Sequence, residues 1–224
     1  DWTGQFWREI GRRVNAVQSS ARARPLIKIC GLTNSEDALE ASRLGADLLG
    51  FVFAPSPRQT TAQKVREIYN QLSQEYKIKP EECASATQGS CCGTPPPSRY
   101  KPLLIGVITD LDSVQTHEAF SLINEGVLDA IQFHGDCSIE TLALFDTTFA
   151  PSACGRFFVQ RLGSDADLAQ LELLCAQGEP RILVDTKIEQ VKGGTGLTIQ
   201  DTLLEKLSQV PGLWLAGGLN PTNI

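Results

Sequence analysis

The stretch Leu26-Ile27-Lys28-Ile29-Cys30-Gly31-Leu32-Thr33 places a thiol where an apolar strand meets a glycine turn. Its first five residues are predicted to form a strand. Because successive strand residues point to opposite faces, Lys28 and Cys30 share one face, about 7 Å apart at roughly 3.3 Å per residue. An ammonium group at that spacing favours a thiolate. Cys30 is therefore a candidate base or nucleophile, the alternative being a small buried apolar residue.

The strand that ends at Cys30 is the first of seven apolar, strand-like runs. Their starts lie about 25 residues apart, with one interval of roughly twice that length, which suits a repeating strand–helix unit. The predicted strands are Leu26–Cys30, Leu48–Phe53, Leu103–Ile108, Leu128–Phe133, Arg156–Gln160, Arg181–Asp185 and Leu213–Ala216.

Helix-compatible segments separate most of these runs. They are Ser35–Leu44, Ala62–Leu72, His117–Asn124, Ile139–Phe145, Ala166–Cys175 and Thr202–Leu207. Apolar strands that alternate with helices indicate a parallel sheet covered by helices. Seven such units predict an α/β fold of the (β/α)8 TIM barrel class, which typically takes about 250 residues. A doubly wound open sheet is the alternative, although it usually has fewer strands.

Two segments fall outside the repeat. Residues 1–24 are assigned as an N-terminal extension or linker, in which apolar side chains at helical spacing predict an amphipathic helix. A targeting segment is the alternative for them. Residues 25–224 are assigned to the barrel, with 77–101, rich in Cys and Pro, as a surface insertion. The sequence stops at Ile224 without an eighth unit, so we expect a barrel truncated after its seventh strand, with two open edges.

The overall composition excludes several classes of protein. With 42% hydrophobic and 21% charged residues the chain is typical of a soluble globular protein. No apolar run reaches the roughly 20 residues of a membrane helix. A net charge of −6 and the lack of a Lys/Arg-rich run argue against a nucleic-acid surface. The seven cysteines show no zinc-ligand spacing, which favours a reduced, cytoplasmic protein without a metal site.

Residues suited to chemistry gather at the carboxyl ends of the predicted strands, where parallel barrels carry their active sites. They are Cys30, Arg58, Asp110, Gln132–Gly135, Asp185, Gly193–Gly196 and Gly217–Pro221. Each has a simpler interpretation, because an aspartate at a strand end often caps a helix and glycines often form turns. Yet glycines before a helix also let backbone N–H groups reach a phosphate. Together they favour a small phosphorylated substrate and acid–base chemistry without a metal.

Six motifs, in order along the chain, resemble phosphoribosylanthranilate isomerase. They are Lys28–Thr33, Gly50–Arg58, Gln132–Gly135, Leu183–Lys187, Gly193–Gly196 and Leu215–Pro221. The resemblance runs from about Pro25 to Ile224 and is interrupted by the Cys- and Pro-rich insertion. Six motifs in sequence make the resemblance specific, whereas any one of them would not.

The resemblance implies a cofactor-free TIM-barrel isomerase of tryptophan biosynthesis. The reaction is the Amadori rearrangement of N-(5-phosphoribosyl)anthranilate to 1-(2-carboxyphenylamino)-1-deoxyribulose 5-phosphate. By resemblance, Cys30 matches the general base, Asp185 the general acid, and Arg58 the residue that faces the anthranilate carboxylate. The remaining implied substrate-binding residues are Gln132, His134, Gly194, Gly217, Gly218 and Asn220.

Other functions stay open at this point. The chain is alternatively an inactive or scaffolding barrel fragment, part of a fused tryptophan-pathway protein. The histidine-pathway isomerase performs the same rearrangement on a barrel, but an acidic residue is expected there at the position of Cys30, which disfavours it. The expected partner is the phosphorylated substrate, with no nucleic acid and no membrane. A homodimer, or fusion to another tryptophan-pathway enzyme, is left open.

Overall fold

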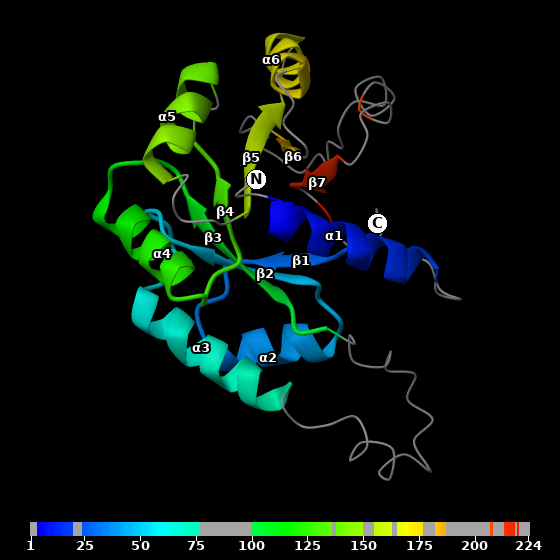
Figure 1. The fold of residues 1–224 in the computed structure, drawn as a ribbon, viewed down its shortest axis with the longest axis vertical. Coiled ribbons are helices and arrows are strands. Elements are labelled where there is room, and N and C mark those ends of the chain that lie inside the picture. The colour runs from blue at the N-terminus through cyan, green and yellow to red at the C-terminus, as the bar shows by residue number, and fades with distance from the viewer. Residues whose placement is uncertain are drawn as a thin grey trace, which may run out of the picture. The chain divides into compact units, whose positions relative to one another are not determined.

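The computed structural model describes residues 4–19, 24–76, 100–135, 138–149, 155–162, 165–176, 182–186, 207, 213–217 and 219. In this part of the chain, strands and helices alternate (Figure 1). The helices are α1 (Gly4–Gln18), α2 (Ser35–Arg43), α3 (Ala62–Glu75), α4 (Val114–Asn124), α5 (Ile139–Phe149) and α6 (Asp165–Ala176). The strands are β1 (Lys28–Cys30), β2 (Leu48–Val52), β3 (Leu103–Ile108), β4 (Ala130–Phe133), β5 (Gly155–Leu162), β6 (Ile182–Thr186) and β7 (Trp214–Ala216).

The seven strands form one sheet in the order β1-β2-β3-β4-β5-β6-β7, and every pairing with a described register is parallel. The predicted α/β class and parallel sheet are therefore confirmed. A doubly wound sheet would reverse its strand order at a switch point, whereas this order follows the sequence throughout. The strand order thus favours the barrel type of winding over the doubly wound alternative.

The predicted insertion 77–101 lies outside the described residues except for Tyr100 and Lys101, and the predicted helix 202–207 lies outside them except for Leu207. The chain divides into two compact units, which are described separately. The first holds residues 1–131 and 148–156, and the second holds residues 132–147 and 157–224. Strands β4 and β5 each have residues in both units.

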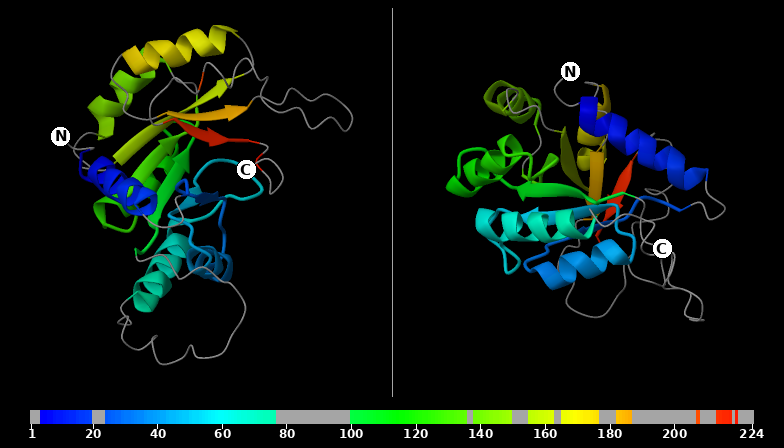
Figure 2. Two further views of the ribbon diagram at one scale, coloured as in Figure 1. Left: turned by 90° about the vertical axis from the view of Figure 1, so that its right-hand side faces the viewer. Right: turned by 60° about the horizontal axis from the view of Figure 1, so that its bottom comes forward.

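Side-chain caps start the helices of the first unit where the sequence places small polar residues. Asn34 accepts a hydrogen bond from the Asp37 amide at 2.8 Å and begins α2. Thr61 and Ser113 cap α3 and α4 in the same way. Such caps satisfy amide groups that a helix end otherwise leaves unpaired. Helix α3 contacts both α2 and α4, and Figure 2 shows α2 and α3 side by side.

The core of the first unit is built on β2 and β3. All six residues of β3 are buried, and β2 is buried except for Val52, which is half-buried. Strand β1, at one edge of the sheet, is more open, with Ile29 40% exposed. Leu215 of β7, at the other edge, is 45% exposed. Among the described strands, β1 and β7 are thus the first and last in the order of the sheet.

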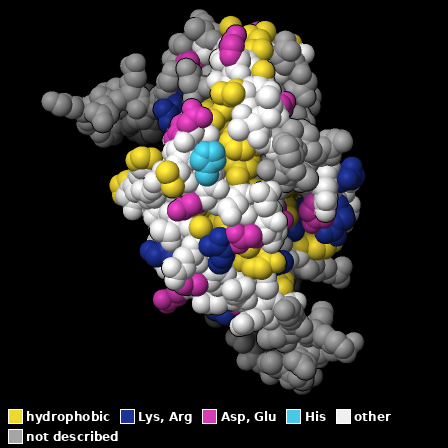
Figure 3. Space-filling view, turned by 60° about the vertical axis from the view of Figure 1, so that its left-hand side comes forward, with side chains coloured by type: hydrophobic (Ala, Val, Ile, Leu, Met, Phe, Trp, Pro, Cys, Tyr) yellow, Lys and Arg dark blue, Asp and Glu magenta, His cyan; other side chains and the backbone are white. Residues whose placement is uncertain are grey.

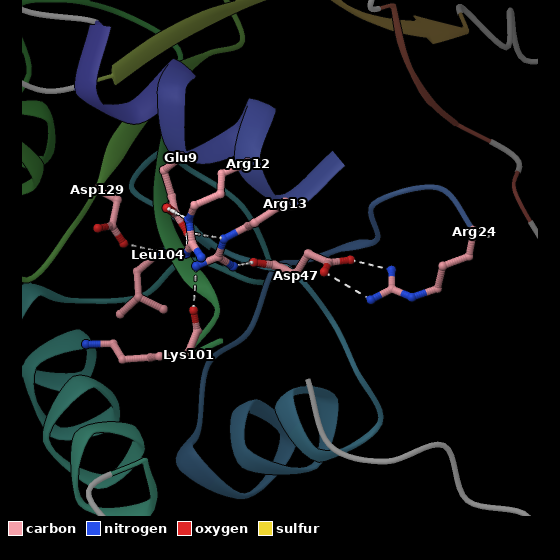
Figure 4. A network of polar contacts seen from close by, with 8 residues as sticks. All are labelled: Glu9, Arg12, Arg13, Arg24, Asp47, Lys101, Leu104 and Asp129. Atoms are coloured by element: carbon pink, nitrogen blue, oxygen red, sulfur yellow. Dashed lines mark hydrogen bonds and ion pairs between the residues drawn. The ribbon is translucent and has the colours of Figure 1, made fainter. Parts of the chain in front are cut away.

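Helix α1 packs on the residues where strands begin. Its Phe6, Ile10 and Arg13 are buried. The Arg13 guanidinium donates to the backbone carbonyls of Asp47 and Lys101, which precede β2 and β3, at 2.9 and 2.8 Å (Figure 4). Within the first unit, α1 therefore packs at the amino-terminal ends of β2 and β3.

Candidate functional site

Cys30 is the last residue of β1, and its side chain is exposed. The backbone then turns at Gly31, where φ is +87°, a value that favours glycine. The amides of Gly31 and Leu32 both donate to the Gly50 carbonyl, at 2.9 and 3.1 Å. The turn is thus tied to β2, which fixes where the thiol leaves the sheet.

The Cys30 thiol and the Lys28 ammonium meet above Gly50. A Cβ placed on Gly50 would lie 2.6 Å from Cys30 Sγ and 2.8 Å from Lys28 Nζ. The two atoms are therefore no further apart than the sum of these distances. Gly50 pairs with Cys30 in the register of β1 and β2, and any larger residue there would displace one of the two groups. A thiol and an ammonium are thus held side by side at the end of β1.

Arg58 joins this group from the loop after β2. Its guanidinium donates to the Cys30 carbonyl at 3.4 Å. Its Cδ lies 2.7 Å from the position a Cβ on Gly31 would take, so a larger residue there would push the Arg58 side chain aside. The side chain of Arg58 is exposed and free to meet an anionic ligand beside Cys30. Two predicted site residues, Cys30 and Arg58, are thus brought together in the first unit.

The second unit brings together two further predicted residues and one that the sequence analysis missed. His134 follows β4, and its Nε2 lies 3.4 Å from Oδ2 of Asp185 in β6. Arg161 of β5 donates its Nε–H to the same His134 nitrogen, also at 3.4 Å. Arg161 is paired with Asp185 in the register of β5 and β6. The predicted strand ends at Gln160. In the structure Arg161 is exposed between buried Gln160 and Leu162, so the alternation of the strand continues past the predicted end.

Aromatic packing shows which face of the sheet carries these polar groups. Phe158 of β5 packs edge-on against Phe133 of β4 and Phe145 of α5, so that face is covered by the helix. Arg161 is three residues from Phe158 and therefore points to the opposite face. Phe157 shares that opposite face with Arg161 and packs against Trp214 of β7. The polar residues thus lie on the face away from the helix, above an aromatic pair.

Gln132 is buried in β4, with 3% of its surface exposed. Its Oε1 accepts no hydrogen bond from the residues that the structure describes. Alternation along the strand places Gln132 on the same face as His134. A buried amide oxygen without a partner costs free energy, which is a reason to expect a ligand or water there.

The predicted phosphate-binding glycines are described only in part. Gly217 follows β7 with φ +82°, a turn conformation that favours glycine. The other three residues predicted for this region, Gly194, Gly218 and Asn220, lie outside the described residues. Over the described ranges, no group of three or more His, Cys, Asp or Glu side chains could hold a metal ion.

The surface charge and the helices bear on two other kinds of site, for nucleic acid and for a membrane. On the face in Figure 3, acidic and basic side chains are interspersed and do not form a field of one sign. Among the helices that the structure describes, none is both long enough and apolar enough to cross a bilayer.

Comparisons with known proteins agree on one family. The family model described as N-(5'-phosphoribosyl)anthranilate (PRA) isomerase matches residues 97–224. The N-(5'-phosphoribosyl)anthranilate isomerase of Thermosynechococcus vestitus is 31% identical, over 92% of this chain and 76% of that protein. The Petrotoga mobilis protein of the same name is 29% identical, over 88% of this chain and 78% of its own.

Two solved structures that are similar to this chain come from the same family. The crystal structure of phosphoribosyl anthranilate isomerase from Thermotoga maritima matches with a TM-score of 0.60 and 26% identity, over 90% of this chain and 80% of that one. The enzyme from Thermus thermophilus matches with a TM-score of 0.56 and 25% identity, over 89% of this chain and 80% of that one. Both similarities extend over most of this chain.

Proposed function

This chain belongs to the phosphoribosylanthranilate isomerase family, and from that premise we propose that it catalyses the Amadori rearrangement of N-(5-phosphoribosyl)anthranilate in tryptophan biosynthesis. The observation that carries the proposal is the convergence of Cys30 Sγ and Lys28 Nζ above Gly50, next to Arg58. The reaction needs a base at a carbon acid and a cation for the substrate's carboxylate. This group of side chains offers both.

The first step assigned here is proton donation by Asp185. Its carboxylic acid gives a proton to the ribose ring oxygen as the bond from that oxygen to C1 breaks. The anilino nitrogen supplies the electron pair that forms the C1–N double bond, and the product is an open-chain iminium. A positioned acid of this kind typically contributes about 10²–10⁴ in rate. Asp185 is half-buried at the end of β6, where a substrate oxygen can reach it.

The second step is proton removal by Cys30. The iminium makes the proton on C2 acidic, and the Cys30 thiolate removes it to give an enolamine. The enol then loses its O–H proton while C1 gains one, which yields the ketone. Lys28 supports this role by placing its ammonium beside the thiol, above Gly50. An acid and a base with opposite protonation states require different environments, and Asp185 and Cys30 have different neighbours.

Substrate binding is assigned to further residues of each unit. Arg58 faces the anthranilate carboxylate, for which a guanidinium provides two parallel N–H donors. Gln132 has an Oε1 without a partner among the described residues, and this oxygen can accept a hydrogen bond from a substrate hydroxyl. Gly217 and Gly218 are assigned, by family resemblance, to the phosphate group, and so are Gly194 and Asn220. His134 is assigned to substrate binding by the same resemblance.

The test is a turnover assay of the protein with freshly generated phosphoribosylanthranilate. The loss of substrate fluorescence measures turnover. We expect turnover in the parent, and loss of most of it in both Cys30→Ser and Asp185→Asn. Circular dichroism of each variant checks that it is folded. Near-normal turnover in either variant would reject the role assigned to that residue.

A folded parent chain without turnover would overturn the proposal. The barrel would then serve as a scaffold, or as part of a larger tryptophan-pathway assembly. The two functions are distinguished by the same assay, because a scaffold has no reason to depend on the Cys30 thiol.

A further inference from the structure

The Lys28 side chain carries its charge toward the carboxyl end of the sheet. Lys28 is paired with Leu48 in the register of β1 and β2. Its Nζ nevertheless lies above Gly50, two residues further along β2. The side chain therefore runs along the sheet to the level of Cys30, which is paired with Gly50.

The Lys28 ammonium has no partner among the residues that the structure describes. The side chain is half-buried, and no hydrogen bond or ion pair joins the ammonium to any of them. Asp47, which directly precedes β2, is already bound by Arg24 at 3.0 Å. An ammonium has three donors and no acceptor, and a cation withdrawn from water is normally paired. We therefore expect an oxygen atom of the ligand to meet Lys28 beside Cys30.

The separation of the thiol and the ammonium suits two neighbouring atoms of the substrate. Cys30 Sγ and Lys28 Nζ are no further apart than the sum of 2.6 and 2.8 Å. A reacting carbon lies about 3–3.5 Å from its base, and an N–H···O hydrogen bond spans about 2.7–3.2 Å. Together these two spans exceed the separation, so Sγ can meet C2 while Nζ meets the oxygen bonded to C2.

We propose that Lys28 is a catalytic residue that donates a hydrogen bond to the C2 oxygen of the substrate. When the enolamine becomes the ketone, the O–H bond at C2 breaks and its electron pair forms the C2–O double bond. The C1–C2 double-bond pair takes a proton from water at C1, the hydroxyl proton leaves to water, and Lys28 keeps its own protons. A fixed donor at this oxygen stabilises the negative charge that develops there. This inference rests on the base role of Cys30 in the proposed function.

The first test compares two ligands that differ only at C2, by titration calorimetry. One is the reaction product, which has a C2 carbonyl, and the other is its analogue with a methylene at C2. We expect the parent to bind the product about 10-fold or more tightly than the analogue, because a charge-assisted hydrogen bond is lost with the oxygen. Lys28→Met, which has similar length and no donor, should abolish this preference. No preference in the parent, or one that survives in Lys28→Met because both ligands weaken equally, would overturn the assignment of Lys28 to the C2 oxygen.

The second test measures turnover. We expect Lys28→Met to lower kcat about 10²-fold with KM within about three-fold, since loss of one such donor costs roughly 10²–10³ in kcat. Lys28→Arg, which keeps a cationic N–H donor, should retain more of kcat. The matched control is Lys64→Met, at an exposed site on α3, which should leave both constants unchanged.

Circular dichroism checks that each variant is folded. A folded Lys28→Met with the kcat of the parent would refute the inference and leave the proposed function standing. A parent that neither turns over the substrate nor binds the product would refute the proposed function, and this inference with it.

Discussion

Phe6 of α1 packs so closely on Gly155 that a Cβ on Gly155 would lie 2.2 Å from the Phe6 ring. Gly155 is the first residue of β5, and Phe6 is buried. Together with the Arg13 hydrogen bonds, this contact attaches α1 to residues where strands begin. Helix α1 lies outside the strand–helix repeat, and these contacts make it part of the packed first unit.

We expect Gly155→Ala to lower the free energy of unfolding by about 1–3 kcal/mol, because overpacking shifts side chains or backbone. The matched control is Gly11→Ala on α1. Apart from the helix's own backbone and the adjacent residues, nothing lies within 4 Å of the Cβ position there, so alanine should raise stability by roughly 0.5–1 kcal/mol. Urea unfolding of both variants checks this. Equal effects at the two glycines would show that the Phe6 contact does not constrain Gly155.

Arg13 offers a second test of the α1 attachment. Its side chain is 5% exposed and satisfies two backbone carbonyls. Arg13→Met should cost about 2–3 kcal/mol of unfolding free energy, since buried acceptors lose their donors. Arg12→Met is the control. Arg12 is 51% exposed, where ion pairs contribute little, so unfolding should be nearly unchanged. Similar losses in both variants would reject the buried role of Arg13.

Glu9 predicts a pH dependence of stability. Hydrogen bonds from Arg12 and then Arg13 lower the pKa of the Glu9 carboxyl below its usual value of 4.5. A lowered pKa means that the ionised form stabilises the fold above pH 4.5, and that this contribution is lost as pH falls through the folded value. The unfolding free energies of Glu9→Gln and the parent should therefore converge in acid. Free energies of unfolding that stay equally far apart from neutral pH to acid would reject this contribution of Glu9.

Gly50 tests the convergence of Cys30 and Lys28. In Gly50→Ala the new Cβ displaces a thiol or an ammonium, both at the ends of side chains, so the protein should still fold. We expect kcat/KM to fall about 10-fold or more, since small displacements of catalytic groups are costly. The control, Gly106→Ala in β3, meets Leu128 and Ile131 instead, and should reduce stability but not kcat/KM. An unaltered kcat/KM in Gly50→Ala would mean that activity does not depend on the spacing of the Cys30 thiol and the Lys28 ammonium.

Arg58 tests how the substrate is held. Arg58→Lys keeps the charge and loses the two-pronged geometry of the guanidinium. We expect KM to rise about 10-fold or more with little change in kcat, because charge-assisted hydrogen bonds contribute roughly 1.5–3 kcal/mol. Steady-state kinetics with phosphoribosylanthranilate measure both constants. A fall in kcat at constant KM would instead place Arg58 among the groups that act on the reacting atoms.

The seven strands could be placed from sequence because each is a short apolar run between helical segments. The predicted bounds of β3 agree with the structure, whereas β5 is longer at both ends than predicted. Its end was misplaced because Gln160 and Arg161 are polar, and polar residues usually mark the end of a strand. Burial of Gln160 on the helix-covered face keeps it in the sheet.

Local sequence by itself determined the α/β class and the approximate positions of the strands, since alternation and helical periodicity depend on neighbours along the chain. It also placed Lys28 and Cys30 on one face. Tertiary structure alone decided that Gly50 lies beneath them, that Phe6 rests on Gly155, and that Arg161 meets His134. Those contacts join residues far apart in the sequence, and they depend on strand register and helix packing, which no local pattern encodes.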